Sequence, residues 1–188
     1  MAKVVTAALT ALLWLTACGM RESYRMQVPA TWLGEIAEDD DENCRALSGE
    51  YEYYGEDSDA SAVDRIRADF YVTAFKRVPV HGARSVKVSY DADASAFYVW
   101  TDQAMGVHGA DQISGTCENG WAIVEGVVSG QGTDAPPQVK QWRSRLKRGT
   151  DGALYVHWTF NMTKKCYLLL ADCHESGEGW TRFAPSAK

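Results

Sequence analysis

The sequence predicts a mainly β protein with one helix, built as a curved antiparallel sheet or as a partly closed, lipocalin-like barrel. Three observations support this fold class. Most segments after residue 84 alternate apolar and polar residues, turn dipeptides such as Asn119-Gly120 separate them, and one stretch alone, about 61–75, shows helical spacing. Eight or so short strands joined by turns favour a single domain.

The first 17 residues have the features of an export signal. Lys3 is the only charge before Arg21, and residues 4–15 are apolar apart from two threonines. An apolar stretch of about 12 residues suits a signal peptide, whereas a membrane-spanning helix needs roughly 20. The sequence therefore predicts a signal peptide over residues 1–17.

The residues that end this signal resemble the lipobox of bacterial lipoproteins. Leu15-Thr16-Ala17-Cys18-Gly19 has a branched apolar residue and two small ones before a cysteine. The resemblance implies that Cys18 becomes the N-terminus, carries a thioether-linked diacylglycerol and has an acylated amino group. Two or more acyl chains anchor a protein durably, which one chain does not. An ordinary cleaved signal with a chance cysteine is the alternative.

The residue at position 19 indicates which membrane would hold such a lipoprotein. In the family's sorting rule an aspartate after the cysteine tends to mean retention in the inner membrane, and this chain has Gly19. The resemblance therefore implies lipid anchoring in the outer membrane of a bacterial envelope. We expect the domain to lie on the periplasmic side.

Composition bounds the size and the partners of the mature protein. Removing 17 residues from 188 leaves 171, enough for one domain with a core. Removing Lys3 takes the formal net charge from −6 to −7. An acidic balance argues against nucleic acid, because phosphate binding relies on an excess of Lys and Arg.

Four further cysteines, Cys44, Cys117, Cys166 and Cys173, indicate disulfide bonds. An even number in an exported chain favours two bridges, and four cysteines allow three pairings. We favour Cys166 with Cys173, because the segment "CYLLLADC" can form a strand and return after a tight turn, which leaves Cys44 with Cys117. The spacing fits no standard zinc site, so neither a metal nor a cofactor is expected.

Residues 18–43 are expected to be the lipidated N-terminus and a flexible acidic tether. The run "EDDDEN" over 38–43 is typical of a solvated segment. Trp32 within this region could instead dock on the domain or touch lipid head groups. The globular β-rich domain is then expected over 44–188.

The domain opens with a tyrosine-rich strand. Tyr51 and Tyr53 alternate with Glu52 and Tyr54, a pattern that suits a half-buried strand. The block "CRALSGEYEYYGE" resembles the opening of small uncharacterised envelope lipoproteins of proteobacteria, in which a cysteine precedes Leu-Ser-Gly and a tyrosine strand. It is also similar to the first strand of lipocalins, although Tyr51 stands where a tryptophan is usual. These resemblances imply a fold and no activity.

The helix is expected over about 61–75. Ser61 with Asp64 fits a capping box, and Val63, Ile66 and Phe70 fall near one helical face. The tail "FYVTAF" over 70–75 is rich in β-forming residues and competes with this interpretation.

Hairpins make up the rest of the domain. "SVKVSY" over 85–90 and "SAFYVW" over 95–100 pair across a turn, and Asn119-Gly120 joins "QISGTC" to "WAIVEGVV" in a type I′ turn. Asp151-Gly152 forms the turn of a long hairpin over 138–162, in which Trp142, Leu146, Leu154, Val156, Trp158 and Phe160 face inward. "KCYLLL" and "GWTRFA" supply the last two strands. Apolar residues on both faces of 98–100 suggest a sheet that is covered on both sides or lines a cavity.

No catalytic signature is present in the sequence. Asp172, His174 and Glu175 could bind a metal or form an acid–base pair, but we interpret them as a solvated turn. His108 and Asp111 receive the same interpretation.

A cationic row on the outward face of the long hairpin is the main candidate site. Arg143, Arg145 and Lys147 alternate along one arm, and Tyr155, His157 and Thr159 lie on the other. Such a row could contact anionic sugars or phosphates. The alternative is that neighbouring acids such as Glu125 neutralise it across strands.

Three functions remain open. The first is a noncatalytic membrane-anchored lipoprotein whose β domain binds an envelope protein or an anionic envelope glycan or lipid. The second is a lipocalin-like carrier of a small apolar ligand. The third is a hydrolase or metal-dependent enzyme built around His108, His157 or His174.

Overall fold

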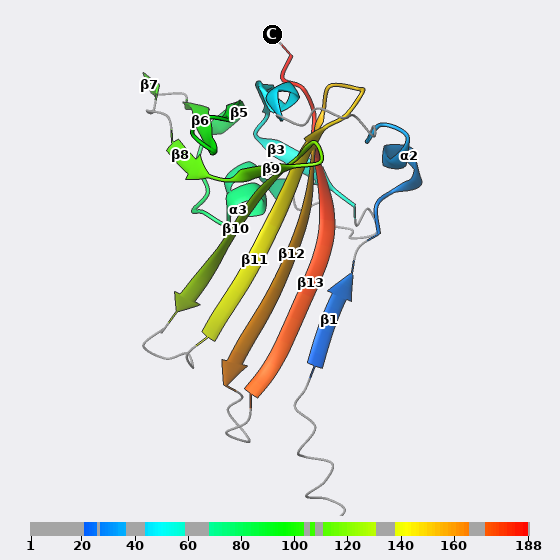
Figure 1. Ribbon diagram of the computed structural model, residues 1–188, viewed down its shortest axis with the longest axis vertical. Helices are drawn as coiled ribbons and strands as arrows, with labels where there is room; N and C mark the ends of the chain where they lie inside the picture. The colour runs from blue at the N-terminus through cyan, green and yellow to red at the C-terminus, as the bar shows by residue number, and fades with distance from the viewer. Residues whose placement is uncertain are drawn as a thin grey trace, which may run out of the picture. The chain divides into compact units, whose positions relative to one another are not determined.

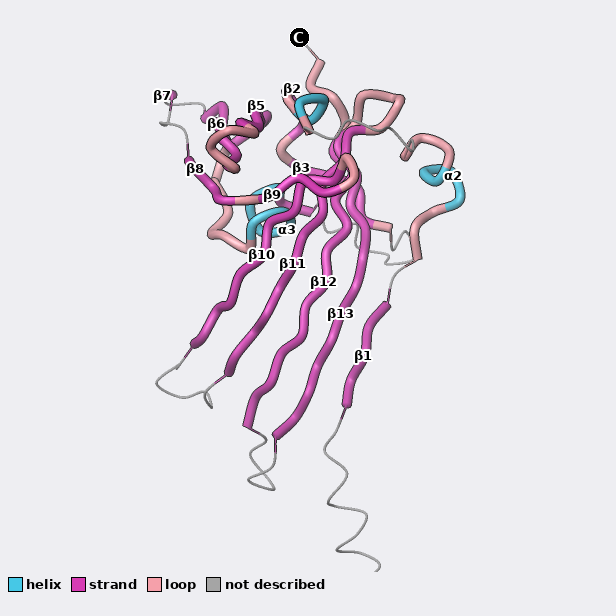
Figure 2. The backbone as a smooth tube through the Cα atoms, viewed as in Figure 1, coloured by secondary structure: helices cyan, strands magenta, loops and turns pink. Residues whose placement is uncertain are grey.

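The computed structural model describes residues 21–25, 27–36, 44–58, 68–103, 106–107, 111–130, 138–165 and 172–187. Most of these residues belong to strands, and helices are few and short (Figures 1 and 2). The predicted signal peptide and Cys18 lie outside the described residues. The mainly β prediction is confirmed.

The strands are β1 (Arg21–Arg25), β2 (Gly49–Glu52), β3 (Tyr54–Asp57), β4 (Ala68–Asp69), β5 (Ala83–Asp91), β6 (Ala96–Gln103), β7 (Gly106–Val107), β8 (Asp111–Ser114), β9 (Thr116–Glu118), β10 (Trp121–Gly130), β11 (Gln138–Arg148), β12 (Leu154–Lys165) and β13 (Asp172–Phe183). The helical elements are α2 (Ala30–Leu33), the 3₁₀ helix η1 (Arg45–Leu47) and α3 (Phe70–Phe75).

Two open sheets contain these strands. The eight-stranded sheet has the order β4-β3-β13-β12-β11-β10-β9, and β1 also pairs with β13 (Figure 1). The five-stranded sheet has the order β2-β5-β6-β7, and β8 also pairs with β6. Within the described chain, the strands at the two ends of each order do not pair with each other. The open antiparallel sheet is therefore the alternative that the described strands support.

The chain divides into two compact units. Unit 1 comprises residues 1–24, 127–141 and 160–177, and unit 2 comprises residues 25–126, 142–159 and 178–188. The hydrophobic core lies in unit 2 between the two sheets. Its fully buried side chains include Tyr51, Tyr53, Phe70, Val86, Val88, Phe97, Val99, Leu146, Leu154, Val156 and Phe183.

The predicted tyrosine strand is present but changes sheet at Tyr53. Tyr51 and Tyr53 are buried while Glu52 and Tyr54 are exposed, as the alternation predicts. β2 pairs with β5, whereas β3 pairs with β13 in the other sheet. The Tyr53 hydroxyl donates to Asp69 Oδ1 at 2.9 Å and accepts from the Val80 amide at 2.7 Å, so the buried phenol is satisfied at this crossing.

The helix is shorter than predicted in the part that the structure describes. Residues 59–67 lie outside the described residues, Ala68 and Asp69 form β4, and α3 begins at Phe70. The Asp69 side chain caps α3 by accepting from the Val72 amide at 3.2 Å. The "FYVTAF" segment is thus helical despite its β-forming composition, because five of its six side chains are buried in the core.

The predicted turns agree with the structure. β5 and β6 pair as an antiparallel hairpin. Asn119 and Gly120 have φ of 53° and 71° between β9 and β10, and Gly152 has φ of 79° between β11 and β12. These left-handed values are what asparagine and glycine adopt most readily. Of the predicted "KCYLLL" strand, Lys165 ends β12 and residues 166–170 lie outside the described residues.

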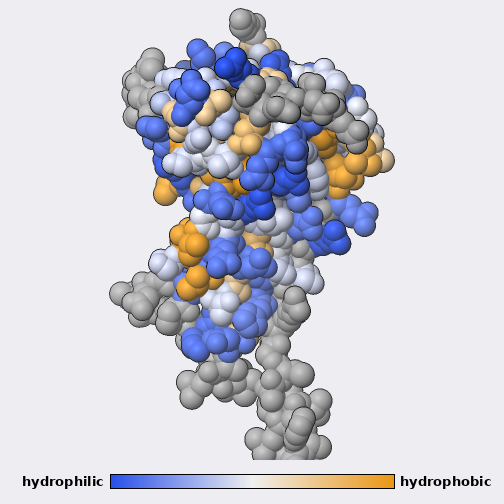
Figure 3. Space-filling view, viewed as in Figure 1, coloured by the Kyte–Doolittle hydropathy of each residue, from blue (hydrophilic) through white to orange (hydrophobic). Residues whose placement is uncertain are grey.

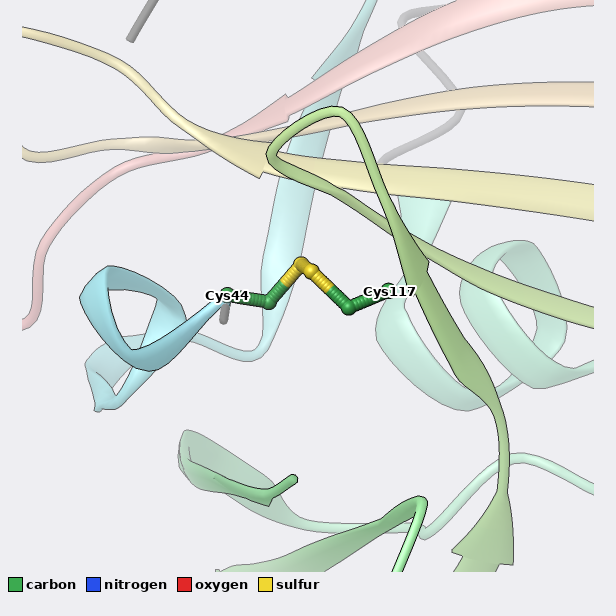
Figure 4. The surroundings of a disulfide bond; sticks show 2 residues. All are labelled: Cys44 and Cys117. Carbon is green, nitrogen blue, oxygen red and sulfur yellow. A yellow bond between two sulfur atoms is a disulfide. The ribbon is translucent and has the colours of Figure 1, made fainter. Parts of the chain in front are cut away.

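A disulfide bond joins Cys44 to Cys117, with the Cα atoms 5.9 Å apart (Figure 4). It connects the residue before η1 to the middle of β9. This pairing was predicted. Cys173 is also disulfide-bonded, and its predicted partner Cys166 lies outside the described residues.

The described part of the predicted tether belongs to the fold. β1 pairs with β13, and the carbonyl of Glu35 accepts from the Thr150 amide at 2.9 Å. The Trp32 ring lies edge-on to Tyr155, with ring centroids 5.8 Å apart. Docking on the domain is therefore the alternative for Trp32 that the structure supports, and residues 37–43, with the acidic run, lie outside the described residues.

Candidate ligand-binding face

The cationic row lies on the face of the eight-stranded sheet that is opposite the core, here called the outer face. Side chains alternate along β11, so that Ser144 and Leu146 are fully buried on the core side. Arg143, Arg145 and Lys147 therefore share the outer face. All of them belong to unit 2.

Exposure along this row is uneven. Arg143 is exposed, Arg145 is half-buried and Lys147 is buried. The alternation predicts the shared face but not the burial of Lys147, which is 6% exposed. At that end of the row the Trp121 ring of β10 lies 5.6 Å from Lys147 Nζ.

Two carboxylates neutralise Arg143. Its Nη2 lies 3.6 Å from Glu118 Oε2 and its Nε lies 3.9 Å from Glu125 Oε2. This cross-strand pairing is the arrangement that the alternative interpretation of the row predicts. Arg143 therefore has little free charge to offer a ligand.

Trp121 is the centre of the covered part. The Arg145 guanidinium carbon lies 4.7 Å from the centroid of the Trp121 ring, and Lys147 Nζ lies 5.6 Å from it. The Trp180 ring meets the Trp121 ring edge to face at 6.0 Å. Both cations are thus within the range of cation–π attraction to one indole.

Arg145 differs from the other arginines of the outer face. Its Nε is buried and has no hydrogen-bond partner among the described residues. No carboxylate of the described chain lies within ion-pair distance of its guanidinium. A buried guanidinium nitrogen without an acceptor is unfavourable, because the group has lost water and gained no replacement.

His157 lies beside this group on β12. Its ring stacks on Trp180 at 4.4 Å, and its Nε2 is 2.9 Å from Glu178 Oε1. Glu178 Oε2 also binds Arg25 Nε at 3.1 Å. Burial lowers the pKa of His157 below its ordinary value, and the bond to Glu178, which acts in the opposite direction, does not restore it.

These six residues form what we call the aromatic–cation cluster: Trp121, Arg145, Lys147, His157, Glu178 and Trp180. Arg145, Lys147 and His157 were predicted from the sequence, whereas Trp121, Glu178 and Trp180 were not. Trp121 could have been predicted, because it lies four residues before Glu125 on the same strand and alternation places both side chains on one face. Glu178 and Trp180 join the cluster only because β13 pairs with β12, and the sequence pattern does not specify this pairing.

Tyr155, predicted to contact a ligand, is fully buried. Its hydroxyl donates to Asp151 Oδ2 at 3.0 Å and accepts from Arg182 Nε at 3.3 Å, while Arg182 Nη2 lies 2.8 Å from Asp151. Burial alone would raise the pKa of Asp151, but hydrogen bonds from Arg182, Ala153 and Tyr155 hold it below its ordinary value. Tyr155 is therefore a structural residue, and its predicted exposure is wrong. Thr159, also on β12, donates to the Arg143 carbonyl at 3.5 Å.

The residues Asp172, His174 and Glu175 lie in β13 and not in a turn, which corrects the prediction. Asp172 binds Lys165 at 2.7 Å and Glu175 binds Lys164 at 3.2 Å across to β12, and His174 Nδ1 lies 3.2 Å from Thr163 Oγ1. Cross-strand pairing thus accounts for all three side chains. His108 lies outside the described residues, and Asp111 lies 3.7 Å from Arg77.

The part of the chain that the structure describes holds neither a metal site nor a membrane-spanning helix. No three histidine, cysteine or acidic side chains there are grouped as metal ligands. No helix there is long and apolar enough to cross a bilayer.

The fold and the outer face define a mainly β, disulfide-bonded protein with a cluster of indole rings and cations on one sheet. No protein-family model, curated protein or solved structure matches this sequence.

Proposed function

We propose that the protein is a membrane-anchored envelope lipoprotein without catalytic activity, whose β domain binds an anionic envelope component at the aromatic–cation cluster. The lipobox-like residues 15–19 support the anchor. The Cys44–Cys117 disulfide suits an exported chain, because such bonds persist in oxidising compartments. The ligand class rests on the cluster.

The unpaired guanidinium of Arg145 carries this proposal. Its charge has no acidic partner among the described residues, and its Nε lacks an acceptor. A carboxylate or phosphate of a ligand would supply the acidic partner for this charge. Arginine binds these groups through paired hydrogen bonds, which are stronger than those between neutral groups.

The surroundings of Arg145 strengthen its attraction for an anion. Arg143 and Arg25 are each held by glutamates, so they offer no competing site of equal charge. Lys147 adds a second cation over the same indole. Trp121 and Trp180 give a ligand an apolar surface next to the charge, as binding sites commonly do.

Binding should depend on Arg145 and little on Arg143. We expect Arg145→Gln to weaken binding of a carboxylated oligosaccharide by about 10- to 100-fold, the equivalent of losing one charge-assisted hydrogen bond of about 1.5–3 kcal/mol. Arg143→Gln is the matched control, since it removes the same group from the same face. Titration calorimetry on the full mature chain measures both.

Two further titrations separate the sources of the anion. Vesicles of anionic phospholipid test a lipid head group, and the uncharged parent oligosaccharide tests the need for charge. Equal binding by the wild type, Arg145→Gln and Arg143→Gln proteins would contradict the assignment of Arg145. Equal binding of the charged and uncharged sugars would contradict an anionic ligand.

A further inference from the structure

We propose that unit 1 is the membrane-facing part of the protein and lies directly on the lipid surface in which the acyl chains of Cys18 are inserted. This inference rests on the proposed lipidation of Cys18. It adds an interaction surface and its partner, a bilayer, to the anchor itself.

The first step is the length of chain between the anchor and the fold. β1 begins at Arg21, three residues after Cys18. A fully extended chain spans at most about 3.6 Å per residue, so Arg21 lies within about 11 Å of Cys18. An acylated Cys18 sits at the head-group level of the bilayer, and the start of β1 must therefore lie close to it.

The second step is that β1 is held in the fold. β1 pairs with β13, and its last residue, Arg25, binds Glu178 at 3.1 Å. Glu178 is itself held by His157, whose side chain is 14% exposed. Because β1 pairs with β13, it is a strand of the sheet and does not act as a flexible spacer.

The third step is which residues share a unit with the start of β1. Residues up to 24 belong to unit 1, together with 127–141 and 160–177. If Arg21 lies close to the lipid surface, the other residues of unit 1 lie near that surface as well. The surface of unit 1 is thus the one that the short connection presents to the bilayer.

The side chains of unit 1 suit such a surface. The face drawn in Figure 3 is mostly hydrophilic with separate apolar patches. Among the described residues, three of the seven exposed large apolar side chains belong to unit 1, although it is the smaller unit: Val127 (65% exposed), Val128 (48%) and Val139 (46%). Exposed valines gain by entering the interfacial region of a bilayer.

Lysines accompany these valines in unit 1. Lys140 lies over the Phe160 ring at 4.1 Å and has no ion pair with a carboxylate of the described residues, whereas Lys164 and Lys165 pair with Glu175 and Asp172. A lysine keeps its apolar stem on such a surface while its ammonium reaches the phosphates of the head groups. The valines therefore suit the apolar acyl region of a lipid surface, and the lysine ammonium suits its anionic head groups.

Cross-linking to a photoreactive head group tests the inference. The full lipidated protein is placed in vesicles of phosphatidylethanolamine and phosphatidylglycerol that contain a lipid with a photoreactive head group. Cross-linked peptides are then identified by mass spectrometry. We expect strong labelling of peptides from 127–141 and 160–177.

A spacer variant provides the comparison. Inserting 12 Gly/Ser residues between Gly19 and Met20 adds a flexible connection with an average span of about 20 Å. Labelling of unit 1 should then fall at least about threefold. Unchanged labelling would overturn the inference, since contact would not depend on the short connection.

A second pair of variants tests the valines. Val127→Asn with Val128→Asn should reduce the labelling of unit 1 at least about twofold. Val78→Asn is the matched control, because Val78 is an 81% exposed valine outside unit 1, and it should leave that labelling unchanged. Equal labelling of all three proteins would overturn the role of the valines.

The outcomes distinguish the inference from the proposed function. An intact mass without lipid on Cys18 overturns the anchor, and the membrane-facing role of unit 1 with it. A lipidated chain whose unit 1 is not labelled, or is labelled regardless of the spacer, overturns this inference alone.

Discussion

Two arginines two positions apart on β11 have different roles. Arg143 is exposed and paired with Glu118 and Glu125. Arg145 is half-buried over Trp121 and has a buried nitrogen without a partner. Sequence alternation assigns both to one face and cannot separate them, because the difference depends on side chains of β9 and β10. The same applies to Tyr155, whose burial depends on Trp32, Asp151 and Arg182.

His157 should make stability depend on pH. Its pKa in the folded state is lowered, so the unfolded state binds the proton more readily. Its contribution to the free energy of unfolding is complete above the ordinary histidine pKa of about 6.5 and is lost as the pH falls through the folded-state value. His157→Gln should therefore lose less stability than the wild type between pH 7.5 and pH 5.5, as measured by urea denaturation.

The groups around His157 must stay in place for this comparison. Glu178 binds its ring, and Arg145 and Arg25 oppose its protonation. His81→Gln, at an exposed position, is the control and should behave as the wild type. If His157→Gln and the wild type lose the same free energy over this range, the assignment to His157 is wrong.

At the scale of elements, Gly115 links the two sheets. It follows β8 of the five-stranded sheet and precedes β9 of the eight-stranded sheet, and its amide donates to the Ser95 carbonyl at 2.9 Å. The backbone passes so close to the core here that a side chain has no room. A Cβ atom would lie 2.5 Å from the Phe97 ring and 2.7 Å from the Ile123 carbonyl oxygen.

Gly115→Ala should therefore destabilise the protein. The ring of Phe97 can move, but the Ile123 carbonyl belongs to β10 and cannot move without displacing a strand. We expect the free energy of unfolding to fall by about 1–3 kcal/mol, as overpacking usually causes. Chemical denaturation measures this loss.

Gly34→Ala is the control for Gly115→Ala, because nothing lies within 4 Å of a Cβ atom there. This change should stay within about 0.5 kcal/mol of the wild type. Two variants of equal stability would show that the link between the sheets tolerates a side chain.

Local pattern predicts the elements well and their assembly poorly. The 83–103 hairpin, the Asn119-Gly120 turn and the Gly152 turn follow from period-two alternation and from residues that adopt positive φ. The sheet change at Tyr53 does not, because it depends on which distant strands accept β2 and β3. The helical state of 70–75 likewise follows from burial against the core and not from propensity.

At the scale of the whole molecule, one long-range covalent link is described. Cys44 and Cys117 are 73 residues apart, and closing such a loop contributes about 4 kcal/mol in the chain-entropy model. Cysteine number and compartment predicted two bridges, and the assignment of Cys166 to Cys173 left Cys44 with Cys117. The composition of the aromatic–cation cluster was not predictable, because it gathers residues from β10, β11, β12 and β13.

The intact mass of the mature chain, purified in detergent from bacterial membranes, tests the central claim most directly. The account predicts a chain of residues 18–188 whose mass is increased by a diacylglycerol and an acyl group, both located on Cys18 by fragmentation. A mature chain that begins at another residue, or that begins at Cys18 with an unmodified thiol and amino group, would contradict it.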